Sequence, residues 1–269
     1  MKQILTTVVM LLVLLATSCA KKQVVGEPSI ANSPALQAAA GKKILIIVSA
    51  HPRFGDHAEK TGYWLSEVTH FYHVLAQHGF QIDIASPEGK PSVMDPASYD
   101  LSDNLNQTFW GNPELKQKLE QPLNPTKLQA RDYAVIYFAG GHGTMWDFPA
   151  SDSLAHLAAS IYEQGGIVSA VCHGPAGLLN IKLSNGEYLI KGKRVTGFAN
   201  LEEKLAGKTG LVPYLLEDSL KEKGGIYSRA FFPFASHSIT DNRLVTGQNP
   251  GSATGVGEQV IAVLAGTSK

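Results

Sequence analysis

The stretch Val168-Ser-Ala-Val-Cys-His-Gly-Pro175 joins a short apolar run to a sharp turn. The run Ile167–Val171 has the small and β-branched residues of a strand buried on both faces of a parallel sheet. Gly174 and Gly177 indicate a tight elbow that leads into a helix, because glycine tolerates backbone conformations that other residues resist. The stretch therefore predicts that Cys172 is presented on a strand-to-helix turn.

Outward from this stretch, strand-like and helix-like segments alternate along the chain. The expected strands are Lys43–Ser49, Phe80–Ala85, Tyr133–Phe138, Ile167–Val171, Tyr188–Ile190, Arg194–Thr196 and Leu244–Thr246. The expected helices are Thr61–His78, Pro113–Leu119, Ser151–Gln164, Pro213–Lys223 and Glu258–Leu264. This alternation predicts an α/β fold with an open, mostly parallel sheet and helices on both faces. Ligands of such folds bind beyond the C-terminal ends of the strands, where Cys172 is expected.

The composition is that of one globular domain. The chain has 269 residues, of which 44% are hydrophobic and 17% charged, enough for a substantial core. The domain is expected at 42–269, with an insertion around 87–128 that is dense in Pro, Asn, Asp and Ser and covers one edge. Lys plus Arg and Asp plus Glu each number 23, so the formal net charge is zero. That balance argues against a nucleic-acid-binding surface.

The first residues resemble an export signal. One lysine and an apolar run too short for a comfortable membrane span make 1–18 a predicted signal peptide. The segment ends in Leu15-Ala-Thr-Ser-Cys19, which resembles a bacterial lipobox, although Ala16 replaces the commoner Leu. We expect an exported lipoprotein held by acylated Cys19 at the periplasmic side of the bacterial cell envelope, with a flexible tether at 19–41. Ordinary signal-peptidase cleavage nearby is the alternative.

Only two cysteines occur in the chain, and acylation of Cys19 would leave Cys172 unpaired. Since no internal disulfide explains it, Cys172 becomes a candidate nucleophile. At the start of a helix, free backbone amides and the helix dipole favour a thiolate, and cysteines at such sites have pKa values of ~3.5–7.5. The alternative is a buried structural cysteine.

Three separated motifs carry a family resemblance: Ala170-Val-Cys-His-Gly-Pro175, Gly140-Gly-His-Gly-Thr144 and Val195-Thr-Gly-Phe-Ala-Asn200. Together they resemble the ThiJ/PfpI superfamily, which is related to the class I glutamine amidotransferases. The resemblance is strongest to the heat-inducible branch, which contains glutathione-independent glyoxalases (glyoxalase III) and stress chaperones. It extends from Lys43 nearly to the C-terminus and implies a flavodoxin-like fold.

The resemblance implies roles for four residues. Cys172 matches the nucleophile, and His173 matches its neighbouring histidine. Glu203 matches the acidic residue that orients this histidine, with Glu202 as the adjacent competitor. Glu67 matches a helix-borne glutamate that approaches the cysteine, whereas without the resemblance it would be expected on the solvated surface.

The implied activity is that of a lyase of the glyoxalase III, or D-lactate dehydratase, type. Cys172 would add to a 2-oxoaldehyde such as methylglyoxal and form a hemithioacetal, with Glu67, in preference to His173, moving the protons. The backbone amides of Gly141 and His173 are expected to bind the oxyanion. No redox cofactor is expected, because the oxidation of one carbon and the reduction of the other cancel.

The residues around the glycine-rich motif are candidates for the pocket. His142, Met145 and Trp146 are expected at the pocket mouth, with simple loop packing as an equal alternative. The run Gly140–Gly143 lacks the Gly-Lys-Ser/Thr ending of a phosphate loop, so a nucleotide site is not predicted.

One group of residues on the first long expected helix has a spacing that could bind a metal. Glu67, His70 and His73 share about one helical face, a spacing that permits metal binding. With nine histidines in the chain, such spacing arises easily. No metal is therefore predicted.

Two other functions remain open from the sequence. A cysteine hydrolase of the amidase, peptidase or deglycase type would use the same Cys172, His173 and Glu203. A stress holdase with a redox-sensing cysteine would need a large exposed apolar patch. The expected partner is a small-molecule carbonyl compound, and a homodimer is compatible with the resemblance, because relatives are often dimers.

Overall fold

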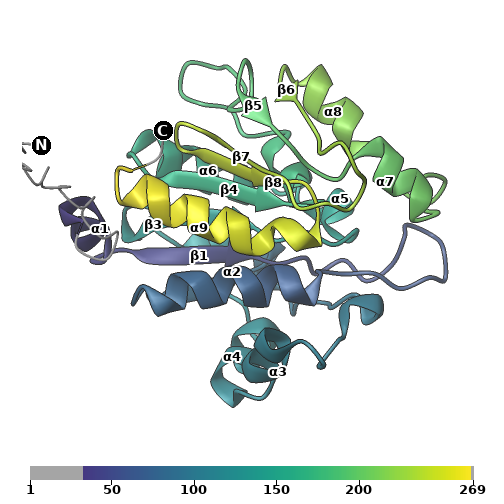
Figure 1. The fold of residues 1–269 in the computed structure, drawn as a ribbon, viewed down its shortest axis with the longest axis horizontal. Coiled ribbons are helices and arrows are strands. Elements are labelled where there is room, and N and C mark those ends of the chain that lie inside the picture. The colour runs from purple at the N-terminus through teal and green to yellow at the C-terminus, as the bar shows by residue number, and fades with distance from the viewer. Residues whose placement is uncertain (1–32, 268–269) are drawn as a thin grey trace, which may run out of the picture.

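A central six-stranded sheet organises the computed structural model, which describes residues 33–267 (Figure 1). Its strand order is β2-β1-β3-β4-β8-β7, and β7 alone runs antiparallel to its neighbour. The strands are β1 Lys43–Ile47, β2 Ile82–Ala85, β3 Tyr133–Phe138, β4 Ile167–Val171, β7 Ser238–Asp241 and β8 Leu244–Gly247. The predicted α/β fold with a mostly parallel sheet is confirmed.

The inner strands are buried because their sequences are apolar on both faces. Every residue of β3 and β4 is buried, which fits strands covered by helices on both sides. Parallel strands place their C-terminal ends at the same edge of the sheet. The loops that follow β1, β3, β4 and β8 therefore meet at one edge, and this edge holds the site described below.

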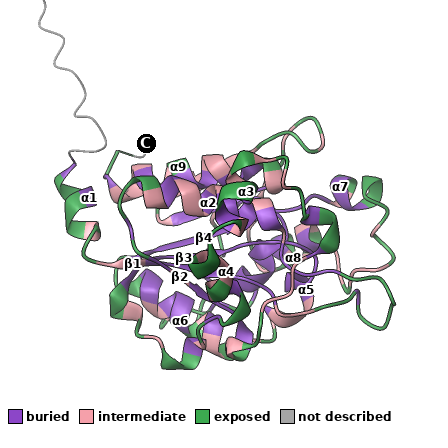
Figure 2. Ribbon diagram, turned by 90° about the horizontal axis from the view of Figure 1, so that it is seen from below, coloured by how far each residue is buried: buried purple, intermediate pink, exposed green. Residues whose placement is uncertain are grey.

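Helices cover both faces of the sheet (Figure 2). Helices α2 (Leu65–Gln77) and α9 (Ala253–Leu264) lie together on one face, and α6 (Asp152–Glu163) lies on the other. Gly257 allows α9 to approach α2 closely, since a Cβ atom there would lie 3.0 Å from Cβ of Val74. On the sheet side of α2, the Phe71 ring stacks on Tyr137 of β3 with 3.7 Å between ring centroids.

The chain between β2 and β3 forms the insertion expected around 87–128. It contains α3 (Asn104–Trp110) and α4 (Pro113–Glu120). Helix α4 contacts the edge strand β2 and α3 contacts α2, where the side chains of Thr69 and Asn106 are hydrogen-bonded at 2.5 Å. The insertion thus covers one edge of the sheet and supports the helix that carries Glu67.

A smaller layer lies beside β7 and β8. It consists of β5 (Arg194–Val195), β6 (Ile226–Tyr227), α7 (Asn200–Leu205) and α8 (Leu216–Glu222). The short helix α5 (Thr144–Asp147) follows β3, and 3₁₀ turns occur at Pro87–Gly89, Pro96–Ser98, Pro125–Lys127, Ala130–Asp132, Gly174–Leu178 and Pro250–Ser252.

Some predicted elements differ from the structure. The predicted strand Tyr188–Ile190 forms a turn, in which Tyr188 makes one isolated bridge to Lys182. The predicted closing helix at 258–264 is α9, which begins five residues earlier, at Ala253. Strand β7 and helices α3 and α7 were not predicted, because they are short and carry polar residues that hide their periodicity.

Part of the segment predicted as a tether is helical. Helix α1 (Pro34–Ala39) is capped by Ser33, and Leu36 is buried. Oγ of Ser33 also donates a hydrogen bond to the backbone oxygen of Ala265, 2.7 Å away. The burial of Leu36 and the hydrogen bond of Ser33 attach α1 to the end of α9. In the described part of the chain, no helix has the length and apolarity needed to cross a membrane.

Candidate active site

Cys172 lies at the C-terminal end of β4 on the expected sharp turn. Its φ is +58°, a left-handed conformation that is rare for residues other than glycine. The turn is held on both sides, because its amide donates to the backbone oxygen of Gly247 (2.9 Å) and its oxygen accepts from the amide of Phe198 (2.8 Å). Gly174 is required next to it, since a Cβ atom there would lie 2.1 Å from the oxygen of Phe138.

The thiol of Cys172 is buried, with 3% of the residue exposed. Burial raises its pKa well above the ordinary value, and the neighbouring Glu67 raises it further when that carboxyl is ionised. The prediction of a thiolate favoured by a helix start is therefore wrong. The elbow leads into the 3₁₀ turn Gly174–Leu178 rather than an α-helix. The dipole of this short turn stabilises a thiolate by less than the burial of the charge costs.

Glu67 of α2 is fully buried beside this thiol. Oε2 accepts a hydrogen bond from the amide of Gly140, with 2.6 Å between nitrogen and oxygen. Oε1 has no partner with hydrogen-bond geometry in the described part of the chain, although the Cys172 thiol is close enough to lower the pKa of the carboxyl. Burial is the larger effect and raises the pKa of Glu67 to about 8, so the group is mostly protonated at neutral pH.

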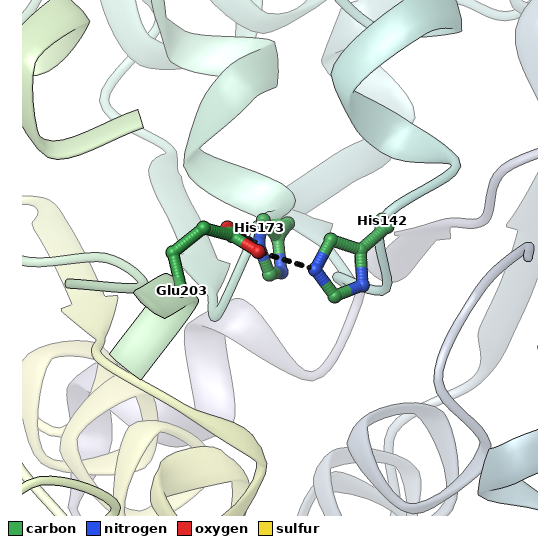
Figure 3. Close-up of side chains that lie close together, drawn as sticks. All are labelled: His142, His173 and Glu203. Atoms are coloured by element: carbon green, nitrogen blue, oxygen red, sulfur yellow. Dashed lines mark hydrogen bonds and ion pairs between the residues drawn. The ribbon is translucent and has the colours of Figure 1, made fainter. Parts of the chain in front are cut away.

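Glu203 of α7 links two histidine rings (Figure 3). Oε2 lies 2.8 Å from Nε2 of His173, and Oε1 lies 2.9 Å from Nε2 of His142. Burial alone would raise the pKa of Glu203, but the hydrogen bonds from the two histidines outweigh it and lower the pKa below its ordinary value. Glu203 is therefore an ionised carboxylate that orients both rings. Nδ1 of His173 in turn lies 3.3 Å from Sγ of Cys172.

The adjacent Glu202 has a different set of partners. It accepts hydrogen bonds from the amides of Ala199 and Phe234 and from Nδ2 of Asn249. These contacts fix the start of α7 and the segment that contains Phe234. The geometry thus assigns the histidine contact to Glu203 and a structural role to Glu202.

Two backbone amides are available next to the elbow. The amides of Gly141 and His173 donate to no backbone oxygen within 33–267, and the His173 amide is close enough to the Cys172 sulfur to lower the pKa of that thiol. Their loops are in direct contact, since a Cβ atom on Gly140 would lie 2.7 Å from the amide nitrogen of His173. Gly141 has φ +99°, and a Cβ atom there would lie 2.3 Å from the oxygen of Gly62. The structure therefore places in contact the two loops that carry the expected oxyanion donors.

A pocket of about 490 Å³ opens above Cys172, His173 and His142. Its wall includes four aromatic residues and two lysines that were not predicted: Phe54, Trp64, Phe198, Phe234, Lys60 and Lys208. Met145 and Trp146 do not line this pocket, which corrects their predicted place at its mouth. Met145 is buried, and Trp146 stacks on His51 with 5.0 Å between ring centroids, so both have the alternative role of loop packing.

The metal site considered on α2 is not formed. Glu67 bonds to Gly140, whereas Nε2 of His70 lies 2.9 Å from Oδ2 of Asp103, so these side chains do not converge. The nitrogen and oxygen atoms of His142, His173 and Glu203 do lie within 4.8 Å of one another. Both oxygens of Glu203 are already hydrogen-bonded to the two imidazoles, so this cluster is a hydrogen-bond network centred on the carboxylate.

Comparisons with known proteins agree with this geometry. The model of the DJ-1/PfpI family matches residues 60–263. The chain is 34% identical to glyoxalase 3 of Candida albicans, over 82% of this chain and 97% of that protein. It is also 34% identical to a glutathione-independent glyoxalase of Saccharomyces cerevisiae, over 80% and 94% of the two chains. The crystal structure of a 24 kDa rapid encystment protein of Francisella tularensis has 40% identity and a TM-score of 0.80, covering 83% of this chain and 99% of that one.

The prediction of an exported lipoprotein is wrong on these comparisons. The curated relatives are fungal glyoxalases, whereas a lipobox is a bacterial export signal. Cys19 and the predicted signal peptide at 1–18 lie outside the described residues, as does the predicted tether up to residue 32.

Proposed function

The chain belongs to the DJ-1/PfpI family, and from this premise we propose that it is a glutathione-independent glyoxalase. It converts 2-oxoaldehydes such as methylglyoxal to 2-hydroxy acids such as lactate. The observation that carries the proposal is the pairing of the Cys172 thiol with the buried carboxyl of Glu67, which lies beside it. A nucleophile and a buried acid or base with a pKa near neutrality are what an intramolecular proton shift on a bound carbonyl compound requires.

In the first step, sulfur adds to the aldehyde carbon. Because ionised Glu203 can only accept, Nε2 of His173 carries a hydrogen and donates it to Oε2. Nδ1 is the ring nitrogen that faces the sulfur and accepts the thiol proton. A carbon–sulfur bond forms as the carbonyl π bond breaks. The resulting oxyanion is bound by the amides of Gly141 and His173 and then takes the proton from Nδ1, which gives the hemithioacetal.

In the second step, Glu67 moves the carbon-bound proton. The ionised carboxylate removes the proton from the carbon attached to sulfur, and the resulting enediolate receives it at the neighbouring carbon, while the hydroxyl hydrogen passes to the oxygen of that carbon. The product is a thioester of a 2-hydroxy acid, which water hydrolyses to the free acid and the Cys172 thiol. One carbon is oxidised and its neighbour reduced, so no external electron acceptor is consumed. With a pKa of about 8, Glu67 is a strong enough base and is still partly ionised near neutral pH.

The pocket supports a small carbonyl compound as the partner. Aromatic side chains of Phe54, Trp64 and Phe198 form an apolar wall around the sulfur. Such a wall favours the alkyl group of a 2-oxoaldehyde and excludes much of the water that would compete for the oxyanion donors. A hydrolase that uses Cys172, His173 and Glu203 alone leaves the buried carboxyl of Glu67 without a function, so the glyoxalase is favoured.

The decisive experiment follows lactate in a reaction that contains the purified full chain and methylglyoxal but no glutathione. We expect lactate from the wild type and none above background from Cys172→Ala. Absence of lactate with the wild type, or an equal yield from Cys172→Ala, would contradict the proposal.

One observation favours a holdase as a second function. The segment 228–237 exposes Phe231 (85%), Phe232 (69%) and Phe234 (50%), and exposed aromatic residues of this kind are unusual unless they bind a partner. We expect the full chain to suppress the aggregation of a heat-denatured test protein, measured by light scattering. The variant Phe231→Ser/Phe232→Ser should lose this effect while it keeps lactate formation. Equal suppression by both proteins would exclude the segment as the binding surface.

A further inference from the structure

The Glu203 carboxylate orients two imidazoles, of which the proposed reaction uses only one. His173 faces the sulfur, whereas His142 comes from the loop after β3 and reaches the other carboxylate oxygen (Figure 3). The two ring centroids are 4.0 Å apart. A second histidine held this firmly beside a nucleophile requires an explanation.

The hydrogen bonds fix the protons of His142. An ionised carboxylate only accepts hydrogen bonds, so Nε2 of His142 carries a hydrogen and donates it to Oε1 of Glu203. Burial and the neighbouring His173 lower the pKa of His142 to about 4, so the ring is neutral at physiological pH. A neutral imidazole with hydrogen on Nε2 has an unprotonated Nδ1, which is an acceptor.

This Nδ1 belongs to a residue of the pocket wall. His142 lines the pocket together with Cys172. Within the described part of the chain, Nδ1 of His142 has no hydrogen-bond partner, and it is not among the side-chain atoms sealed from solvent. Phe54 and Phe198 pack beside the ring, with centroid distances of 4.9 Å and 6.1 Å, and limit its movement. The ring therefore presents a fixed acceptor to a molecule bound on Cys172.

The other groups of the site are already assigned to different atoms. Nδ1 of His173 faces Sγ of Cys172, and Oε2 of Glu67 is held by Gly140. In the first step His173 protonates the oxygen on the sulfur-bearing carbon, and Glu67 acts on carbon, so neither group is assigned to the oxygen of the neighbouring carbon. Conversion of the hemithioacetal to the thioester, however, requires one oxygen to lose a hydrogen and the other to gain one.

We propose that Nδ1 of His142 carries a proton between the two oxygens of the bound substrate, an inference that rests on the proposed glyoxalase function. Nδ1 takes the proton from the hydroxyl on the sulfur-bearing carbon as that carbon becomes a thioester carbonyl. The imidazolium formed, stabilised by Glu203, returns the same proton to the oxygen of the neighbouring carbon, which becomes the hydroxyl of the product. Glu67 moves the carbon-bound proton in the same conversion, so atoms and electrons balance. A neutral imidazole with a lowered pKa serves an enediol in the same manner in triosephosphate isomerase, where it polarises the carbonyl.

The test separates formation of the hemithioacetal from its turnover. His142→Gln retains an amide that can donate to Glu203 but has no nitrogen that accepts a proton, and His156→Gln, on an exposed position of α6, is the matched control. Mass spectrometry of the quenched protein measures the adduct with methylglyoxal, and lactate measures turnover. We expect His142→Gln to form the adduct at the wild-type rate and to lower kcat by about 10²–10⁴-fold. His156→Gln should match the wild type in both.

A second variant tests the proton transfer itself. His142→Ala leaves a space that opens to the pocket, and added imidazole should restore part of kcat, with a rate that depends on the pKa of the methylimidazole used. This rescue decides the matter if His142→Gln does not fold. Rescue that is absent or independent of that pKa overturns the inference.

The remaining outcomes are also distinct. Wild-type turnover by His142→Gln, or an equal loss of adduct and turnover, overturns the role of His142 and leaves the glyoxalase activity of the wild type intact. Absence of lactate with the wild type itself removes the proposed function and the inference together.

Discussion

Oε2 of Glu67 lies 2.6 Å from the amide nitrogen of Gly140, so the loop after β3 holds the carboxyl of α2 against the sulfur of Cys172. This contact joins residues 73 positions apart in the chain. It fixes one oxygen of the carboxyl and leaves the other, Oε1, without a hydrogen-bond partner in the described part of the chain.

Replacement of Glu67 by Gln should stop turnover while the thiol still reacts. The amide keeps the shape of the carboxyl but cannot remove a proton from carbon, so we expect kcat to fall by about 10²–10⁴-fold. Cys172 should still form an adduct with methylglyoxal, which mass spectrometry detects. Normal turnover in Glu67→Gln would remove Glu67 from the mechanism.

The same residue makes stability depend on pH. Because the pKa of Glu67 is raised from 4.5 to about 8, the folded state holds a proton that the unfolded state releases. The stabilisation is complete below pH 4.5 and is lost as pH rises through about 8. The difference between these values corresponds to at most about 5 kcal/mol, at about 1.4 kcal/mol per pH unit.

Urea unfolding from about pH 5 to about pH 9 measures this dependence, because this range covers most of the interval between the two pKa values. We expect the unfolding free energy of the wild type to decrease with pH, and that of Glu67→Gln to change less. Parallel curves for the two proteins would show that Glu67 does not titrate as described.

Gly140→Ala tests the contact between the two loops. A Cβ atom there would lie 2.6 Å from the oxygen of Val171, 2.7 Å from Oε2 of Glu67 and 2.7 Å from the amide of His173. We expect a loss of about 1–3 kcal/mol in unfolding free energy and a larger relative loss of kcat, since the clash separates the acid from the oxyanion donor. Gly210→Ala, where nothing lies within 4 Å, is the control for both measurements.

The two neighbouring glutamates of α7 should separate catalysis from stability. Glu203→Gln replaces one carboxylate oxygen by an NH2 group, which can only donate to the histidine it faces, and this disturbs the protonation of His173. We expect kcat to fall by about 10²–10⁴-fold with little change in Tm. Glu202→Gln replaces one of the two acceptor oxygens by an NH2 donor, so the amide of Ala199 or that of Phe234 loses its acceptor, and this should lower Tm with a smaller effect on kcat at low temperature. A loss of kcat in Glu202→Gln together with a loss of Tm in Glu203→Gln would contradict the catalytic role of Glu203 and the structural role of Glu202.

Much of the fold could be predicted from local sequence. Runs such as Tyr133–Phe138 and Ile167–Val171 are apolar throughout, and this is sufficient to identify strands buried in a parallel sheet. Ser238–Asp241 was missed because it is a half-buried edge strand with polar residues. Tyr188–Ile190 was assigned wrongly because its apolar side chains are buried in a turn, which periodicity cannot distinguish from a short strand.

Less of the site than of the fold could be predicted from the sequence, because the contacts of the site connect distant segments of the chain. The sequence elbow located Cys172, but the family resemblance was needed to select Glu67 and Glu203. The bond between His142 and Glu203 spans 61 residues and has no local signal. The raised pKa of Cys172 also depends on burial by other segments, so the expectation of a thiolate from the elbow alone was wrong.

The left-handed turn at Cys172 has a consequence for the synthesis of the chain. Its backbone is hydrogen-bonded to the amide of Phe198 and to the oxygen of Gly247, and both of these residues are synthesised after the cysteine. A nascent chain that ends before Gly247 has the sulfur but lacks one of the two bonds that hold it in a strained conformation. Both supports of the strained turn can therefore form only after the chain has been synthesised past Gly247.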